Sequence, residues 1–402
     1  MLDRAANSNA PPPGGGLRIL HVFRAPLGGL FRHVVDLTRG QAAAGHSVGI
    51  VCDSTTGGDV ADRLLAELAP ILKLGVSRIP MQRNPGANDL FAIRHVLART
   101  RQTQPDVVHG HGSKGGLYAR LPGLWSARTV RAYTPHGGSF NYKPGTYGHK
   151  LYMAVERVLK AGTDIFLFES AFIADRFCAY AGDPGALTRV VWNGIDTSEF
   201  VPVMPDKDAA DFLYIGELRA AKGIDTFIDA LAEVELRSDF LPRVVLAGTG
   251  PDRDLLIEQV VARGLSNRVV FAGAMPARKA FQRARTMVVP SRAESLPYVV
   301  LEAAGGRMPL ISTNVGGIPE IFGPYADRLI PCDNAGIMAN RMLAAMRQSD
   351  EQRLSEAAEL SSFVATRFTI AKMVEAVISG YRDALRVKPH SVRSLAAAAI
   401  SN

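Results

Sequence analysis

Residues 286–311 read TMVVPSRAESLPYVVLEAAGGRMPLI, and this stretch contains two glutamates eight positions apart, Glu294 and Glu302. An apolar run precedes the first glutamate, and Pro297 lies between the two. Proline is favoured in the first turn of a helix, so the pattern predicts a strand, a turn and then a helix. Glu294 and Ser295 would lie in the turn and Glu302 in the second helical turn. A solvated helix charge would explain either acid alone, so the rest of the chain has to be considered.

The same order of strand and helix recurs along most of the sequence. Runs such as LRILHVF (17–23) and DIFLFES (164–170) are apolar without alternation, as expected for strands covered on both faces. Amphipathic stretches such as NDLFAIRHVLARTRQ (88–102) alternate with these runs. This alternation, with glycine-rich turns at strand ends, predicts α/β domains with doubly wound parallel sheets.

One segment interrupts the alternation and divides the chain. The stretch TSEFVPVMPDKDAAD (197–211) is rich in prolines and acids, which suits a linker, and the strand–helix order restarts after it. Two Rossmann-like domains facing a central cleft are therefore expected, with the cleft lined by the carboxyl ends of strands. The predicted order is a disordered leader (1–16), an N-terminal domain (17–197), a second domain (198–368), a C-terminal helix crossing back (369–387) and a flexible tail (388–402).

The composition narrows the setting of the protein. The chain has 402 residues, of which 47% are hydrophobic and 21% charged, as in soluble globular proteins. No apolar run approaches the ~20 residues needed to span a bilayer. The three cysteines are far apart in the sequence and match neither a zinc-site spacing nor a disulfide framework. A cytoplasmic location is therefore predicted.

The net charge of +8 is carried entirely by the N-terminal half. Residues 1–197 contain 22 Lys and Arg against 14 Asp and Glu, whereas residues 198–402 contain 24 of each. This asymmetry favours an anionic partner for the first half, such as a phosphate-bearing acceptor or the inner face of the cytoplasmic membrane. Improved solubility is the alternative explanation. The basic residues are not interleaved with aromatic ones, so nucleic acid is not expected as a partner.

Two glycine-containing strand ends in the second half suggest a phosphate site. In GELRAAKGIDTF (216–227) a strand is predicted to end at Gly216, and Gly223 is predicted to begin a helix. Lys222, Arg219 and the amides of the helix start would bind a diphosphate. A second predicted strand ends in Gly248 and Gly250, but no third glycine completes a dinucleotide fingerprint, which argues against a dehydrogenase.

The two glutamates complement this phosphate site. Carboxylates accept two hydrogen bonds at once from vicinal hydroxyls, so the two acids could hold two hydroxyl-rich groups on either side of a phosphate. A Gly316-Gly317 turn would allow close backbone approach nearby. The pairs Asp206-x-Asp208 and Asp252-x-Asp254 are interpreted as linker acids and as helix-start acids. No metal or cofactor is therefore expected.

These segments, in order, resemble a known family. GELRAAKG, AGTGP, FAG and PSRAESLPYVVLEAAGGRMPLISTNVGGIPE are similar to the donor domain of the retaining glycosyltransferases of family 4, which have the GT-B fold; the resemblance covers about residues 17–385. It implies that Glu294 holds hydroxyls of the transferred sugar, that Glu302 holds the ribose of the nucleotide, and that Lys222 and Arg219 hold the diphosphate. The remaining implied donor-binding residues of this half are Gly216, Gly248, Gly250, Ser295, Leu296 and Pro297.

One position departs from the family pattern. Many members have arginine directly after the strand-ending glycine, where this chain has Glu217. Lys222 matches the family motif, whereas Arg219 is only a substitute for the absent guanidinium.

The N-terminal half carries its own part of the resemblance. Gly28-Gly29 matches the loop where acceptor and diphosphate approach, and His136 matches the histidine that faces the transferred sugar. DVVHGHGSKGGLYARL (106–121) and AYTPHGGSF (132–140) are similar to bacterial surface-polysaccharide members in particular. His109 and His111 could suggest a metal, but hydrogen bonding at the sheet end is preferred because no carboxylate or cysteine partner lies nearby in the sequence.

The implied activity is transfer of a hexose-type sugar from a UDP or GDP sugar to a hydroxyl acceptor, with retained configuration and without a metal. The implied acceptor is lipid-linked or a polysaccharide, in cell-surface polysaccharide synthesis. Glu294, His136, Lys222 and Arg219 are the expected catalytic residues. The alternatives are a nucleotide-sugar epimerase or phosphorylase with the same fold, and a non-catalytic sugar-nucleotide binding module. The sequence identifies neither the sugar nor the base nor the acceptor.

Overall fold

The computed structural model describes residues 15–121, 128–142 and 144–388, so most of the predicted leader and tail (1–14 and 389–402) lies outside the described residues. The described chain divides into two compact units. The first unit comprises residues within Met1–Phe168, Phe177–Arg189 and Val374–Asn402, and the second comprises Glu169–Arg176 and Val190–Met373. The chain enters the first unit again at Val374, in agreement with a C-terminal helix that crosses back.

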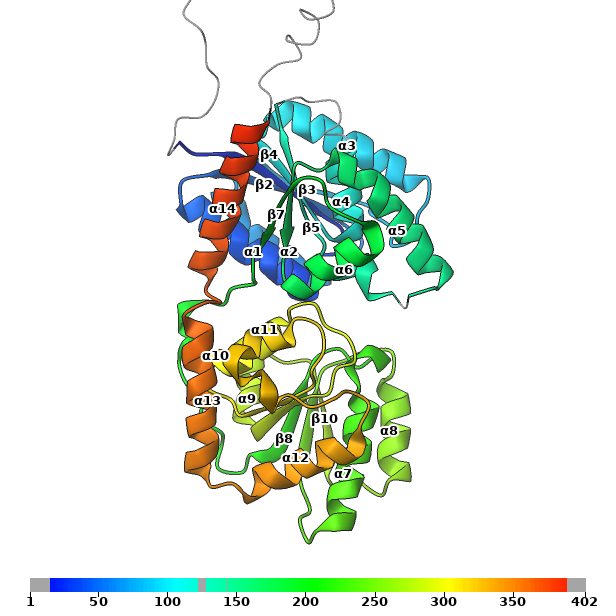
Figure 1. Cartoon of the computed structure of the whole chain (residues 1–402), viewed down its shortest axis with the longest axis vertical. Helices are drawn as coiled ribbons and strands as arrows, with labels where there is room; N and C mark the ends of the chain where they lie inside the picture. The colour runs from blue at the N-terminus through cyan, green and yellow to red at the C-terminus, as the bar shows by residue number, and fades with distance from the viewer. Residues whose placement is uncertain (1–14, 122–127, 143, 389–402) are drawn as a thin grey trace, which may run out of the picture. The chain divides into compact units, whose positions relative to one another are not determined.

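Within its described residues the first unit is built on a seven-stranded sheet in the order β3-β2-β1-β4-β5-β6-β7 (Figure 1). Strand pairing is parallel from β3 across to β6. The sheet grows outward in both directions from β1, as in a doubly wound fold. The strands are β1 (Arg18–Phe23), β2 (Ser47–Asp53), β3 (Gly75–Ile79), β4 (Val107–His111), β5 (Val130–Thr134), β6 (Ile165–Phe168) and β7 (Leu187–Val190).

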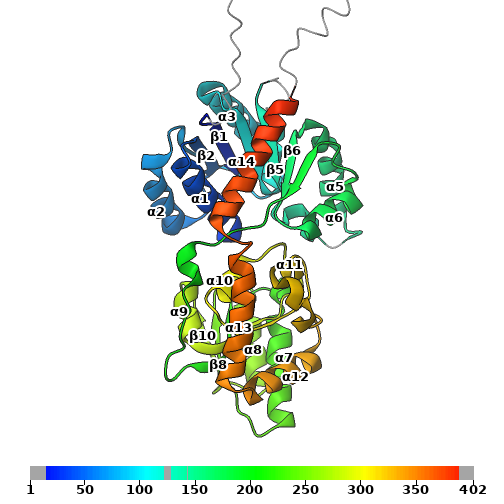
Figure 2. The same ribbon diagram turned by 60° about the vertical axis from the view of Figure 1, so that its left-hand side comes forward.

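Helices connect these strands, and the C-terminal helix α14 returns to pack on them (Figure 2). A Cβ on Gly40 of α1 would lie 2.4 Å from Val374 Cγ2, which shows how closely α1 and α14 approach. The helices of this part of the chain are α1 (Gly28–Ala43), α2 (Gly58–Leu68), α3 (Asn88–Thr103), α4 (Gly112–Arg120), α5 (Tyr147–Leu159), α6 (Ala171–Ala181) and α14 (Ile370–Val387).

The second unit has a five-stranded parallel sheet in the order β10-β9-β8-β11-β12. Its strands are β8 (Ala210–Ile215), β9 (Val244–Ala247), β10 (Val269–Gly273), β11 (Ala284–Val289) and β12 (Leu310–Ser312). Its helices are α7 (Ile224–Arg237), α8 (Arg253–Ala262), α9 (Ala277–Gln282), α10 (Tyr298–Gly305), α11 (Ile318–Phe322), α12 (Ala335–Arg347) and α13 (Asp350–Ala365). Because β8 and β11 are neighbours, the loops that follow them begin side by side.

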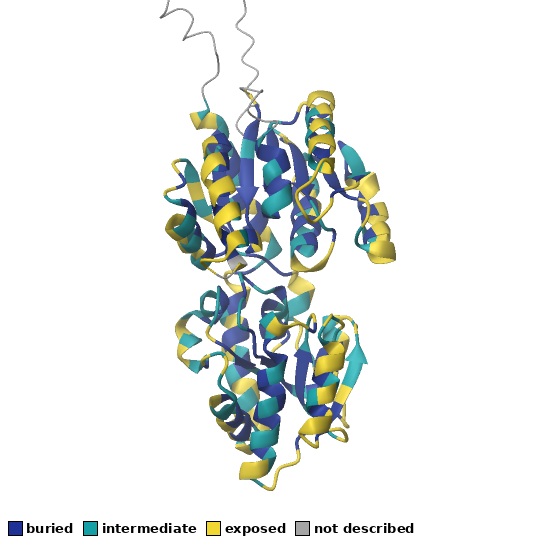
Figure 3. Cartoon of the chain, turned by 90° about the vertical axis from the view of Figure 1, so that its right-hand side faces the viewer, coloured by how far each residue is buried: buried dark blue, intermediate teal, exposed yellow. Residues whose placement is uncertain are grey.

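Apolar side chains cover both faces of this sheet. Successive residues of a strand point to opposite faces. In β8, Phe212 and Tyr214 accordingly belong to one apolar cluster and Leu213 to the other. Figure 3 shows the strands of each unit as mainly buried and the outer faces of the helices as exposed. The apolar runs without alternation are explained by this covering, and the prediction of doubly wound α/β domains is confirmed.

The described residues include no helix that is long and apolar enough to cross a membrane.

Candidate active site

The loop that follows β8 carries Lys222 to the loop that follows β11. A short 3-10 turn, Ala220–Lys222, leads into Gly223, which precedes α7 and has a φ of +66°. A Cβ on Gly223 would lie 2.0 Å from the Pro290 carbonyl oxygen, so only glycine allows this approach. Lys222 is thereby held beside the turn that contains Glu294.

Lys222 and Glu294 form a close ion pair. The distance from Lys222 Nζ to Glu294 Oε1 is 2.6 Å, and the Ser291 hydroxyl donates to the same oxygen at 2.7 Å. Glu294 is 8% exposed. Both contacts go to Oε1, and Oε2 makes no hydrogen bond to the described part of the chain. This arrangement leaves a carboxylate oxygen able to accept from a ligand hydroxyl.

A two-glycine turn packs beneath this carboxylate and fixes the backbone that carries it. A Cβ on Gly316, whose φ is +61°, would lie 1.9 Å from the Glu294 carbonyl oxygen, and one on Gly317 would lie 2.2 Å from that of Ser295. The Gly317 amide donates to the Ser295 carbonyl at 2.7 Å. The loop is thus held by backbone contacts that a larger residue would prevent.

The structure places the rest of the opening motif in the predicted order. Pro297 is the N-cap of α10, and Glu302 lies in the second turn of that helix, half-buried. Leu296 is buried and its carbonyl accepts from the Asn193 side chain at 2.8 Å. This bond gives Asn193 a structural role. Ser295 is half-buried in the turn.

The strand-end glycines of β8 and β9 are explained by contacts between two loops. The Gly216 amide donates to the Ala247 carbonyl at 3.0 Å, and a Cβ on Gly248 would lie 1.8 Å from the Gly216 carbonyl oxygen. A Cβ on Gly250 would lie 2.2 Å from the Leu218 carbonyl oxygen. These glycines let the two loops meet, whatever they also contribute to a ligand.

Arg219 forms an ion pair within its own loop. Its guanidinium lies 3.1 Å from the Glu217 carboxylate, and both side chains are about half exposed. Glu217, which occupies the position of the family arginine, therefore contacts Arg219, the residue expected to take over the role of that arginine. Such an exposed pair is weak and can be exchanged for an anionic ligand.

Arg292 links the two loops of the site and was not predicted from the sequence. Two of its nitrogens donate to the two Asp225 oxygens at 2.8 and 2.7 Å, and a third donates to Asp333 at 2.5 Å. Its guanidinium also donates to the Ala220 carbonyl, two residues before Lys222. Burial raises the pKa of Asp225, but Arg292 outweighs this and the pKa is lowered. The sequence offered one signal for Arg292, because it directly follows Ser291, the residue that contacts Glu294.

The pair Asp252-x-Asp254 lies at the start of a helix. Asp252 is the N-cap of α8 and Asp254 lies in its first turn, as the dipole explanation predicts.

The first unit contains the other predicted residues. Gly28 and Gly29 begin α1 and are exposed, and a Cβ on Gly28 would meet no atom within 4 Å. His136 follows β5 with a φ of +53°, which is uncommon for a residue other than glycine. Such backbone strain persists only where the surroundings enforce it and is frequent at functional sites.

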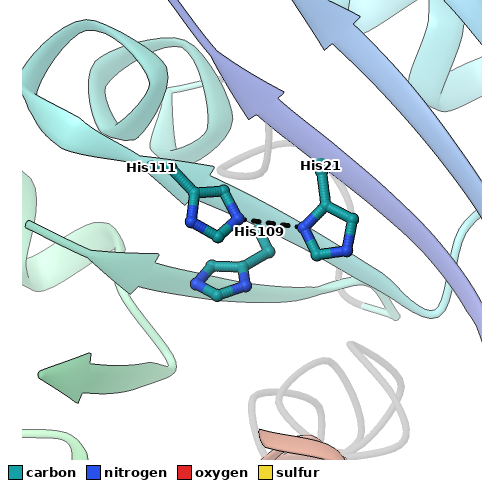
Figure 4. A group of neighbouring side chains, drawn as sticks. All are labelled: His21, His109 and His111. Carbon is teal, nitrogen blue, oxygen red and sulfur yellow. Dashed lines mark hydrogen bonds between the residues drawn. The ribbon is translucent and has the colours of Figure 1, made fainter. Parts of the chain in front are cut away.

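His136 joins a cluster that includes three histidines of β1 and β4, His21, His109 and His111, which Figure 4 shows. The ring of His111 lies 3.0 Å from that of His136 and 2.9 Å from that of His21, measured between nitrogens. His109 contacts the hydroxyls of Tyr381 and Thr134 at 2.7 and 2.9 Å. Hydrogen bonding at the sheet end, the interpretation preferred for His109 and His111, agrees with these contacts.

Two sets of three rings in this cluster have nitrogens within 4.8 Å of one another, His21 with His109 and His111, and His33 with His111 and His136. Burial lowers the pKa of His21 to about 4 and lowers that of His136 well below its ordinary value. Burial therefore favours the neutral form of both rings.

The sequence matches two models of glycosyltransferase families. The model described as Glycosyltransferase Family 4 matches residues 27–199, and the model described as Glycosyl transferases group 1 matches residues 197–360. Glycogen synthase of Mycobacterium tuberculosis is 29% identical over 342 residues, which cover 78% of this chain and 81% of the relative. The putative teichuronic acid biosynthesis glycosyltransferase TuaC of Bacillus subtilis is 26% identical over 71% of this chain and 72% of its own length.

Among solved structures, Anabaena Alr3699/HepE in complex with UDP-glucose has a TM-score of 0.74, with 17% identity and coverage of 90% of this chain and 98% of that one. Sucrose-phosphate synthase from Thermosynechococcus elongatus has a TM-score of 0.76, with 18% identity and coverage of 91% and 98%. The two family models together extend from residue 27 to residue 360, across both sheets. The chain therefore belongs to the group 1, family 4 glycosyltransferases, which have the GT-B fold.

Proposed function

We propose that this glycosyltransferase transfers a hexose-type sugar from a UDP or GDP sugar to a hydroxyl of a lipid-linked or polysaccharide acceptor, with retained anomeric configuration. We place it in cell-surface polysaccharide synthesis, in the cytoplasm and at the inner face of the membrane. TuaC, named for teichuronic acid biosynthesis, and the HepE complex with UDP-glucose support this substrate class.

The observation that carries the proposal is the Lys222–Glu294 pair at the ends of two neighbouring strands. Cleavage of the anomeric bond leaves negative charge on the departing diphosphate. A cation held in a largely buried position stabilises such charge without reorganisation during the reaction. We assign this role to Lys222, and Arg219 can add a second cation by exchanging Glu217 for the phosphate.

Glu294 then has the role of a sugar ligand. Lys222 and Ser291 hold Oε1, so the free energy of ordering the carboxylate is supplied before the sugar binds. Oε2 accepts from hydroxyls of the transferred sugar, and Glu302 from those of the ribose. We assign no general base, because the resemblance implies attack on the same face assisted by the leaving phosphate. In this scheme Lys222, Arg219 and helix-start amides stabilise the diphosphate, so no metal is required.

A donor screen tests the proposal. The full chain is incubated with UDP and GDP hexoses in EDTA and, separately, in magnesium, with and without a lipid-linked acceptor. We expect nucleotide release that depends on the acceptor and is equal in EDTA and magnesium. Conversion of the donor without acceptor would indicate an epimerase instead, and tight binding without turnover would indicate a binding module. Activity that requires a divalent metal would contradict the metal-independent mechanism.

A further inference from the structure

The histidine cluster of the first unit contains a continuous hydrogen-bonded path that begins at His136. From there it passes to His111, then to His21, and ends at Gln41 of α1. The three contacts measure 3.0, 2.9 and 2.8 Å. Exposure falls along the path, because His136 is half-buried whereas His111 is 1% exposed and His21 and Gln41 are 0% exposed. His136 is therefore the end of the path that a ligand can reach.

The direction of the protons follows from the buried end. Gln41 faces His21 with its amide oxygen, which can only accept, so His21 carries its proton on Nε2. A neutral imidazole has one donor and one acceptor, so His21 Nδ1 accepts from His111 Nε2. By the same rule, His111 Nδ1 accepts from His136 Nε2. His136 is then left with a bare Nδ1.

The Gln41 side chain is fully buried, and Oε1 is its atom that contacts His21, whereas its Nε2 makes no hydrogen bond to the described residues. His109 is on a separate branch, since its two nitrogens contact Tyr381 and Thr134.

We propose that Gln41, acting through His21 and His111, fixes His136 as the neutral tautomer protonated on Nε2, so that Nδ1 accepts a hydrogen bond from a hydroxyl of the transferred sugar. The identity of the ligand rests on the proposed function. The hydrogen-bonded path from Gln41 to His136, which we call the relay, does not. Gln41, His21 and His111 are positioning residues. A neutral acceptor requires a substrate that donates, which a sugar hydroxyl does.

A metal is a weaker explanation of the same cluster. Each nitrogen of His21, His109 and His111 already has a polar partner at hydrogen-bond distance. The relay accounts for these contacts without breaking any of them.

The test measures the tautomer directly. The full chain is labelled with ¹⁵N-histidine, and long-range ¹H–¹⁵N correlation spectra at neutral pH show which ring nitrogen carries the proton. The His136 signals are assigned from their loss in His136→Gln. We expect His136, His111 and His21 to be protonated on Nε2 in the unmodified protein. A His136 ring protonated on Nδ1, or on both nitrogens, would overturn the proposal without any variant.

A distant substitution then tests the coupling. Gln41→Met keeps the side-chain length but removes the acceptor, which leaves the His21 Nε2–H buried and unpaired. Orphaned buried N–H groups are rarer than bare acceptors, so we expect the chain to reverse and His136 to become protonated on Nδ1. Thr38→Val is the matched control, because Thr38 is on the same helix and fully buried, and its hydroxyl makes no hydrogen bond to the described residues. An unchanged His136 tautomer in Gln41→Met would contradict the relay.

Kinetics connect the tautomer to the sugar. Nucleotide sugars in which fluorine replaces a single hydroxyl are compared at each position remote from the anomeric carbon. Fluorine accepts hydrogen bonds only weakly and cannot donate them. We expect one position at which fluorine lowers kcat/KM about ten-fold in the unmodified enzyme and in Thr38→Val, and less in Gln41→Met. An equal penalty in Gln41→Met would contradict the acceptor role of Nδ1. Absence of transfer with every donor would instead refute the proposed function, while the spectra would still decide the relay.

Discussion

Lys222 Nζ lies 2.6 Å from Glu294 Oε1, although 72 residues separate the two in the chain. The pair forms because β8 and β11 are neighbours, and because Gly223 allows the loop after β8 to approach Pro290. A largely buried cation is thus placed beside the carboxylate proposed to hold the sugar.

This pair makes the two residues energetically coupled. We expect Lys222→Met to lower kcat about 100-fold, because the departing phosphate loses its cation. Glu294→Gln should also lower kcat, and the double variant should lose less than the product of the two effects, because each single change leaves the partner unpaired. The kcat values of the four proteins measure this. Lys207→Met, at an exposed lysine of the same unit, is the control, and strictly multiplicative losses would contradict the coupling.

The two glutamates should differ in which kinetic constant they affect. Glu302→Ala removes a ligand of the ribose, which is bound equally in ground and transition states, so we expect the donor KM to rise about ten-fold with little change in kcat. Glu294→Ala should mainly lower kcat, because sugar placement determines transition-state geometry. Glu258→Ala, at an exposed glutamate of α8, is the control. Near-normal kinetics in both variants would contradict the ligand roles assigned to the two glutamates.

The buried histidines should make the first unit sensitive to acid. Burial lowers the pKa of His21 from 6.5 to about 4, so between these values the unfolded chain binds a proton that the folded chain does not. The free energy of unfolding should therefore fall as the pH is lowered, by roughly 2 kcal/mol at about pH 5 from His21 alone. Urea unfolding at about pH 7.5 and about pH 5 measures this. His21→Gln should show a smaller pH dependence, and an equal dependence would contradict the assignment.

Much of the fold could be predicted because its signals are local. Apolar runs of strand length and glycines at strand ends are visible in the sequence, and parallel strands bring their carboxyl ends to one edge. Lys222 and Glu294 could therefore be expected near each other, since each follows a strand of the same sheet.

The remaining parts of the site depend on the positions of side chains. Ser291 and Arg292 make their contacts through rotamers that no spacing specifies. The histidine path requires α1 to present Gln41 to β1, a rotation that the amphipathic pattern does not determine. Arg219 is expected from the sequence to bind phosphate, and its pairing with Glu217 is visible only in the folded chain.

The outer face of α5 gives the charge asymmetry a specific location. Its single acid, Glu156, is buried and paired with Arg120 at 2.8 Å, so that no acidic side chain of this helix is exposed. Lys150 and Arg157 are exposed there. Four apolar residues of this helix are also exposed, namely Tyr147 (83%), Leu151 (43%), Val155 (37%) and Val158 (73%). A helix with basic and apolar exposed residues suits the interface of an anionic membrane.

We expect the full chain to sediment with vesicles that contain phosphatidylglycerol but not with pure phosphatidylcholine, and to be released by salt. Exposed charges are screened over about 10 Å at 0.1 M ionic strength, and each basic residue near the surface contributes about 1 kcal/mol. Lys150→Glu with Val158→Asp should weaken binding, whereas Lys207→Glu in the other unit should not. Equal sedimentation with both vesicle types would leave the charge as a solubility feature.

The anomeric configuration of the product tests the central claim most directly. The transferred sugar is followed by NMR from an α-linked nucleotide donor to the acceptor, with Glu294→Gln measured in parallel. We predict an α-linked product that requires the acceptor and forms far more slowly in the variant. A β-linked product, or unaltered transfer by Glu294→Gln, would contradict a retaining transfer organised by the Lys222–Glu294 pair.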